Sequence, residues 1–117
     1  MITREPANIE PDPSAQPQTL SVQQAIDFGV QHHTSGDLSK AESIYQQILQ
    51  AEPDHPDALH LLGVIAHQKG ENDRAVDLIT KAIDIKPDYA EAFNNLGNVF
   101  KKTGQVDEAV ENYQKAL

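Results

Sequence analysis

The amino-acid sequence predicts an all-α fold, a solenoid of three antiparallel helix pairs (six helices). The prediction depends on evenly spaced glycines, on apolar stripes with helical periodicity, and on the lack of any evident strand pattern. All six glycines fall into two series whose members lie 34 residues apart: Gly29, Gly63 and Gly97, and Gly36, Gly70 and Gly104. Two more series keep this spacing: Ala41, Ala75 and Ala109, and Pro53 and Pro87. A constant interval of this length indicates stacked two-helix repeats.

Each repeat has the pattern of two amphipathic helices joined by a tight turn. In the second repeat, the first helix carries an apolar stripe at three- and four-residue spacing: Leu59, Leu62, Gly63 and Ala66. The second helix carries another: Ala75, Val76, Ile79, Ala82 and Ile83. Gly70 lies between them, where a left-handed cap ends the first helix without steric penalty. We expect helices near residues 22–34, 38–51, 56–69, 73–85, 90–103 and 107–117.

Gly63 lies inside a predicted helix, where glycine costs about 1 kcal/mol relative to alanine. We interpret Gly63 and Ala75 as small residues that let the two helices of one repeat approach closely. Burial of each large stripe residue, worth about 1.5–3 kcal/mol, offsets that cost. The helix starts are marked by three pairs with the spacing of a capping box: Ser21 with Gln24, Ser39 with Glu42, and Asp88 with Glu91.

Composition limits the possible functions. A chain of 117 residues supports one domain, and we predict a disordered proline-rich leader over 1–20 and a repeat domain over 21–117, with repeats 22–55, 56–89 and a truncated 90–117. The net charge of −9 disfavours binding to nucleic acid or to a membrane surface. The absence of cysteine excludes disulfides and thiolate chemistry. Because no apolar run is long enough for a membrane span or a secretory signal, a cytoplasmic location is expected.

The repeats also share a residue pattern. The third repeat has Phe93, Leu96, Gly97, Phe100, Ala109 and Tyr113 in its series. The second has Leu59, Leu62, Gly63, Ala66, Ala75, Ile79 and Pro87, and the first, which matches less well, has Ala25, Phe28, Gly29, His32, Ala41, Tyr45 and Pro53. This pattern resembles the tetratricopeptide repeat family, whose signature is W-x2-L-G-x2-Y, then A-x3-F, then P. The resemblance implies a right-handed superhelical α-solenoid. It also implies a non-catalytic module that binds a protein or peptide and needs no cofactor.

In a solenoid of helix pairs, the outward faces of the first helices align into one concave surface, the usual binding surface of such proteins. At 100° per residue, the positions opposite the apolar stripe belong to that surface. The candidate peptide-binding residues are Val30, His33, Asp57, His60, Val64, His67, Gln68, Asn94, Asn98 and Lys101. The same face includes Gln23, Ile26, Thr34, Glu91 and Lys102. Because amide and imidazole groups hydrogen-bond a peptide backbone, an extended peptide or a partner helix is the expected ligand.

Two narrower resemblances fit less well. Tetratricopeptide domains that hold the C-terminal carboxylate of chaperones use lysine, arginine and asparagine on this face. The matching positions here are Ile26, Val30, Leu61, Glu91 and Asn95. Since only Asn95 could serve, a chaperone-tail adaptor is not expected. The chain also resembles arrays that precede O-GlcNAc-transferase-like domains and carry a row of asparagines: Asn94, Asn95 and Asn98 match that row, but Asp27 and Leu61 interrupt it.

Two alternative functions stay open. In the first alternative, the chain is a self-associating scaffold unit that forms a weak homo-oligomer through the uncapped C-terminal helix around Tyr113 and Leu117. In the second, it is an N-terminal regulatory fragment of a larger glycosyltransferase-like enzyme. Catalysis by the chain itself is not expected, because no nucleophile motif or glycine-rich phosphate loop is evident. No metal site is expected either. His60 and His67 lie two helical turns apart, about 10 Å, which is too far for both to bind one zinc ion.

Overall fold

The structure, a computed structural model, describes residues 21–117 as six helices, with no strand among them. The helices are α1 (Val22–Thr34), α2 (Leu38–Ala51), α3 (Pro56–Gln68), α4 (Asn72–Ile85), α5 (Ala90–Lys102) and α6 (Val106–Lys115). The predicted all-α solenoid is confirmed, and each helix agrees with its predicted range to within two residues. The predicted leader, residues 1–20, lies outside the described residues. None of these six helices is long and apolar enough to cross a membrane.

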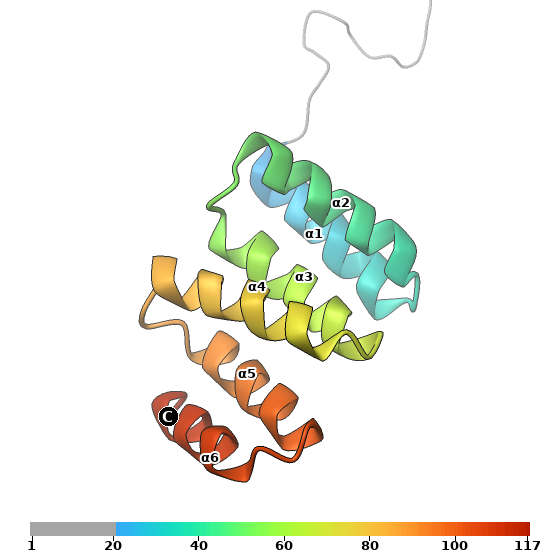
Figure 1. The fold of residues 1–117 in the computed structure, drawn as a ribbon. Coiled ribbons are helices and arrows are strands. Elements are labelled where there is room, and N and C mark those ends of the chain that lie inside the picture. Colours follow the sequence, from blue (N-terminus) through green and yellow to red (C-terminus); the bar gives the residue numbers. More distant parts are fainter. Residues whose placement is uncertain (1–20) are drawn as a thin grey trace, which may run out of the picture.

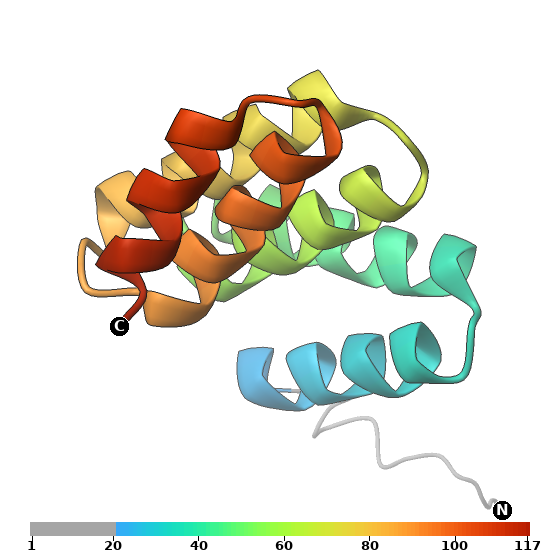
Figure 2. The ribbon, with the colours of Figure 1, turned by 90° about the horizontal axis from the view of Figure 1, so that it is seen from below.

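The helix pairs stack in chain order, from α1 and α2 at one end to α5 and α6 at the other (Figure 1). Figure 2 shows the same stack from the end that carries α6 and the C-terminus. Between repeats, α2 packs on α3 and α4 packs on α5. Buried residues at one spacing on α3 and α5 supply these contacts: Ala58, Leu62 and Ile65, and Ala92, Leu96 and Val99. The repeated spacing in the sequence therefore becomes a repeated helix interface.

The turn within each repeat ends the first helix in the same way. The three glycines of the second series have left-handed backbone angles: Gly36 φ 89°, Gly70 φ 81° and Gly104 φ 81°. At the end of α3, the Gly70 N–H donates to the His67 carbonyl at 3.0 Å, and the Glu71 N–H donates to the Ala66 carbonyl at 2.8 Å. This pair of bonds is the Schellman motif, which satisfies carbonyls that the helix leaves free. The predicted cap at Gly70 is confirmed.

The glycines inside α1, α3 and α5 mark close approaches within a repeat. A Cβ atom placed on Gly63 would lie 2.6 Å from Cγ1 of Ile79 in α4, and one placed on Gly97 would lie 2.7 Å from Cδ1 of Tyr113 in α6. Both distances are shorter than any ordinary carbon–carbon contact. The interpretation of Gly63 as a contact residue is confirmed, and Ile79 is the side chain that lies against it.

Two of the three predicted capping boxes are wrong. Ser21 and Gln24 form the expected reciprocal pair at α1. At α2, however, the cap is Asp37, whose carboxylate accepts from the Lys40 N–H at 3.1 Å, so that Ser39 falls inside the helix. At α5, the capping position is Tyr89 rather than Asp88, and no side chain of residues 21–117 caps the helix.

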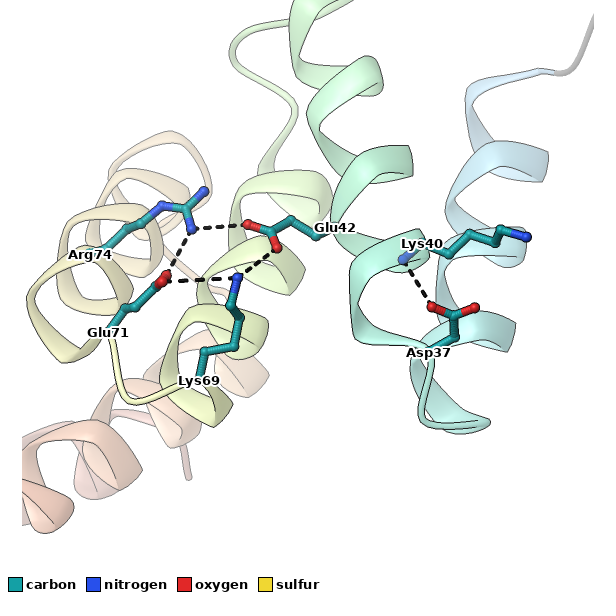
Figure 3. Close-up of polar contacts among 6 residues, drawn as sticks. All are labelled: Asp37, Lys40, Glu42, Lys69, Glu71 and Arg74. Carbon is teal, nitrogen blue, oxygen red and sulfur yellow. Dashed lines mark hydrogen bonds and ion pairs between the residues drawn. The ribbon is translucent and has the colours of Figure 1, made fainter.

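Glu42 takes part in a group of ion pairs that joins the first two repeats (Figure 3). Its carboxylate on α2 pairs with Nζ of Lys69 at 2.9 Å and with the guanidinium of Arg74 at 3.2 Å. Glu71 pairs with the same two cations, at 3.9 Å and 3.0 Å. The pKa of Glu42 is lowered, chiefly by its hydrogen bond from Lys69. This ion cluster fixes α2 against the turn between α3 and α4.

Candidate interaction groove

A groove of about 410 Å³ runs across the first helices of the three repeats. We call it the groove and define it by its lining residues: Ile26, Val30, Asp57, His60, Leu61, Val64, Tyr89, Glu91 and Asn95. They come from α1, α3 and α5, apart from Tyr89, which directly precedes α5. The groove thus lies where consecutive repeats meet, and no single repeat contains it.

One side of the groove is aliphatic. Ile26 and Val30 on α1 lie opposite Leu61 and Val64 on α3. Ile26 is buried and packs in the same apolar cluster as Leu61. Val30 remains 41% exposed, an unusual degree of exposure for an aliphatic side chain that lines a hollow surface. This side therefore offers apolar area that an incoming side chain could cover.

The other side is polar because the residues change from one repeat to the next. The position of Ile26 is occupied by His60 one repeat later, and the position of Leu61 is occupied by Asn95. His60 is only 4% exposed and lies between Tyr89 and Asn95. A polar pair therefore stands between the second and third repeats where an apolar pair stands between the first and second.

A hydrogen-bonded network joins the side chains of Tyr89, His60 and Asp57. The Tyr89 hydroxyl donates to Oδ1 of Asp57 at 2.6 Å, and its oxygen lies 3.0 Å from Nδ1 of His60. Because the hydroxyl proton points to Asp57, Nδ1 carries the imidazole proton and donates to the Tyr89 oxygen. The Asn95 amide then donates to Nε2 of His60 at 2.8 Å. Both imidazole nitrogens are satisfied in the neutral form, which makes His60 a fixed part of the groove wall.

Burial shifts the pKa of two side chains in this hydrogen-bonded network. It lowers the pKa of His60, although the nearby negative charges of Glu91 and Asp57 act in the opposite direction. Burial also raises the pKa of Tyr89, and the hydrogen bond to Asp57 raises it further. At neutral pH the side chains are thus a neutral imidazole and a neutral phenol beside two carboxylates.

The hydrogen-bonded network continues from Asn95 on α5 to Tyr113 on α6. Asn98 donates to Oδ1 of Asn95 at 3.5 Å, and its own Oδ1 accepts the Tyr113 hydroxyl at 2.6 Å. The same position on α1 is Val30, and the tyrosine at the matching position of α2 is Tyr45. The Tyr45 hydroxyl is buried and has no hydrogen-bond partner among residues 21–117. The replacement of asparagine by valine thus leaves one buried hydroxyl unsatisfied.

The structure brings together only part of the predicted binding set. Four of its members line the groove: Val30, Asp57, His60 and Val64. Asn98 donates to Asn95 and does not itself line the groove. His33 is hydrogen-bonded to Gln68, and Nδ1 of His67 lies 3.4 Å from Oδ1 of Asn72 in α4. Asn94 and Lys101 are exposed and do not line the groove. Residues 21–117 contain no group of three or more His, Cys, Asp or Glu side chains placed to hold a metal ion.

Five lining residues were absent from the predicted binding set: Ile26, Leu61, Tyr89, Glu91 and Asn95. Ile26 and Glu91 had nevertheless been placed on the same face as that set. Leu61 and Asn95 each follow a predicted position by one residue, which is a rotation of 100° around the helix. Both had been considered on this face as counterparts of the carboxylate clamp and of the asparagine row, which Asn95 matches and Leu61 interrupts. Tyr89 lies in the connection between α4 and α5, where no helical period applies. Its signal in the sequence was only that an aromatic residue stands where the earlier repeats have Ser21 and His55.

Comparison with known proteins identifies the repeats. Three family models match: one described as TPR repeat over residues 65–104, and two described as Tetratricopeptide repeat over residues 32–83 and 92–117. The chain belongs to the tetratricopeptide repeat family. These families are generally non-catalytic interaction modules, so the chain is a tetratricopeptide repeat module for interaction with proteins.

Solved structures of other tetratricopeptide proteins share the fold. MamA is similar with a TM-score of 0.73 at 27% identity, over 82% of this chain and 56% of MamA. A mutant O-GlcNAc transferase from Thermobaculum terrenum is similar with a TM-score of 0.80 at 31% identity, over 82% of this chain and 18% of the transferase. The second TPR of Spaghetti (RPAP3), solved with an HSP90 peptide bound, has a TM-score of 0.75 at 18% identity, over 81% of this chain and 88% of that one, and shows the fold alone.

The chain therefore spans about half the length of MamA and under a fifth of the transferase. No curated protein sequence matches it.

Proposed function

We propose that the chain binds an extended peptide segment of a partner protein in the groove. The observation that carries the proposal is the lining itself. A partly exposed aliphatic side lies next to hydrogen-bonding side chains that the hydrogen bonds linking Asp57, Tyr89, His60 and Asn95 hold in place. Side chains that are already held in place lower the entropic cost of binding, because fewer of them must become ordered when the peptide binds. The volume of about 410 Å³ is within the range of ligand pockets and accommodates several side chains.

The proposal is tested by selecting binders from a random peptide library and mapping them on the protein. Val64→Glu places a charge on the aliphatic side of the groove and should abolish binding of the selected peptides. Val106→Glu, on the 64% exposed Val106 of α6, is the matched control and should leave binding unchanged. Selected peptides that bind Val64→Glu as well as the unaltered chain would place the binding surface elsewhere. Circular dichroism of both variants checks that they remain folded.

Self-association is the second candidate function, and a specific observation favours it. At the α6 end of the stack, Val106, Val110 and Leu117 are all exposed. Val76, which precedes Val110 by one repeat, is partly buried in the cluster that α4 forms with α5. The α6 face thus presents an apolar repeat interface that no helix among residues 21–117 covers. Sedimentation that depends on protein concentration, and that Val110→Glu abolishes, would support a weak homo-oligomer.

A regulatory role within a larger enzyme is the third candidate. Its support is the likeness to the repeat region of the Thermobaculum terrenum O-GlcNAc transferase, which extends over 82% of this chain. In that case the groove would present a segment of a protein substrate to a catalytic domain outside these residues. The gene sequence beyond the codon for Leu117 decides whether such a domain exists.

A further inference from the structure

The groove has an asymmetric charge distribution. Among residues 21–117, its lining includes two carboxylates, Asp57 and Glu91, and no lysine or arginine. The carboxylates occupy the same position one repeat apart, in the first turns of α3 and α5. Both line the groove together with His60, and their charges act to raise the pKa of His60 against the effect of burial. A negative field at a partly buried site attracts a cation more strongly than the same charges would in open water.

Neither carboxylate is neutralised by the groove itself. Tyr89 occupies only Oδ1 of Asp57 and holds that side chain in place. Within residues 21–117, Oδ2 of Asp57 and the carboxylate of Glu91 have no hydrogen-bond donor or ion-pair partner. Nζ of Lys86 lies 4.5 Å from the Tyr89 ring centroid, and within residues 21–117 it forms no ion pair with Asp57 or Glu91. The acidic end thus keeps acceptors for a further cation.

The aliphatic side lies a fixed distance away. Val64 follows Asp57 by two helical turns, which is about 10 Å along α3. An extended peptide advances about 3.3 Å per residue, so that about three residues span this distance. Val30 and Leu61 lie beside Val64 and give an aliphatic side chain a surface to cover. The groove therefore has two contact points of opposite character at a spacing that one short peptide can match.

We propose that the partner segment is an extended peptide with a lysine or arginine held between Asp57 and Glu91 and an aliphatic residue, about three positions away, placed on Val30 and Val64. This inference rests on the proposed function of the groove and adds the chemistry of its ligand. An acidic segment or a peptide C-terminus would be repelled at the same point, because its charge has the same sign as the two carboxylates.

The test begins with the peptides selected from the random library. We expect them to be enriched in a basic residue about three positions from leucine, isoleucine or valine. Replacement of that basic residue by glutamate should weaken binding about tenfold or more, and added salt should weaken binding of the basic peptide. Fluorescence anisotropy of labelled peptides with the full chain measures both effects.

Variants of the protein complete the test. Glu91→Lys should weaken binding of the basic peptide and strengthen binding of its glutamate counterpart. The fold should tolerate the change, because the Glu91 side chain is exposed and has no hydrogen-bond partner among residues 21–117. Glu111→Lys is the matched control, because it makes the same charge change at an exposed site on α6 and should preserve the preference.

The two proposals fail in different ways. Two results would overturn this inference and leave groove binding intact. Both concern peptides that no longer bind Val64→Glu: such peptides either show no preference for a basic residue or keep their affinity for Glu91→Lys. Peptides that bind Val64→Glu normally would overturn both.

Discussion

An asparagine placed in the first repeat, at the position that Asn98 occupies in the third, should stabilise the protein. In the third repeat the Tyr113 hydroxyl donates to Asn98 at 2.6 Å. In the first repeat the matching hydroxyl, on the fully buried Tyr45, has no partner within residues 21–117, and burial raises its pKa to about 12. The residue at the position of Asn98 is Val30. The variant Val30→Asn therefore offers Tyr45 the acceptor that the third repeat already has.

The magnitude follows from two opposing effects. An unsatisfied buried polar group costs about 1–3 kcal/mol, which a new hydrogen bond recovers in large part. Val30 is 41% exposed, so its replacement removes about 1 kcal/mol of apolar burial at most. We expect a net gain of about 0.5–1 kcal/mol in the free energy of unfolding. In a repeat domain of this size, such a gain raises the melting temperature by about 2–8 °C.

Urea unfolding followed by far-ultraviolet circular dichroism measures the gain, and two control variants isolate its cause. Val64→Asn makes the same change where the matching α4 residue is Ile79, which has no hydroxyl, and it should lose about 1 kcal/mol. In a Tyr45→Phe background, Val30→Asn should lose its advantage. If Val30→Asn is no more stable than Val64→Asn, or if its gain survives in the Tyr45→Phe background, the assignment of the unsatisfied hydroxyl is refuted.

Three further predictions concern packing, charge and pH. Gly63→Ala should lower the free energy of unfolding by about 1–2 kcal/mol in thermal melts, because the clash of its Cβ with Ile79 outweighs a gain of about 1 kcal/mol in helix propensity; an equal or higher melting temperature would contradict this. Glu42→Gln should cost about 0.5–1 kcal/mol in dilute buffer and less in molar salt, and a loss that is independent of salt would exclude the ion pairs as its cause. Stability should fall as the pH decreases below 6.5, because burial lowers the pKa of His60 in the folded chain and the unfolded chain then binds more protons; urea unfolding of His60→Gln should show a shallower fall, and an identical slope would exclude His60.

The sequence was sufficient to predict the fold because its signals are local and repeated. The left-handed glycines fix where each first helix ends, and the apolar stripes fix which faces are buried. The capping boxes show the limit of local spacing. Ser39 and Glu42 have the spacing of a box, but Asp37 is a better cap, and the Glu42 carboxylate pairs with Lys69 on the next repeat instead. A contact between repeats thus overrides a pattern within one helix.

The groove was predicted less completely because it depends on the angle at which the repeats cross. A helical wheel gives the face opposite the buried stripe, but a rotation of one residue decides whether Asn94 or Asn95 lines the groove. The burial of His60 depends on Tyr89 and Asn95, which lie 29 and 35 residues further along the chain. Until the packing of two repeats is known, a polar residue on an open surface and a residue of a buried network have the same sequence pattern.

The specific chemistry of the groove must therefore lie in the differences between repeats. Glycines and alanines that recur every 34 residues can only specify the stack, because they are alike in every unit. Ile26 and His60 occupy one equivalent position, and Leu61 and Asn95 occupy another. The contact of Ile26 with Leu61 is nevertheless apolar, whereas His60 and Asn95 are hydrogen-bonded. Their change of character along the stack creates one aliphatic and one polar side within a single groove. A protein with the apolar pair, or with the hydrogen-bonded pair, at every junction between repeats would keep the fold and lose this asymmetry. It would then have no basis for binding one end of a peptide in preference to the other.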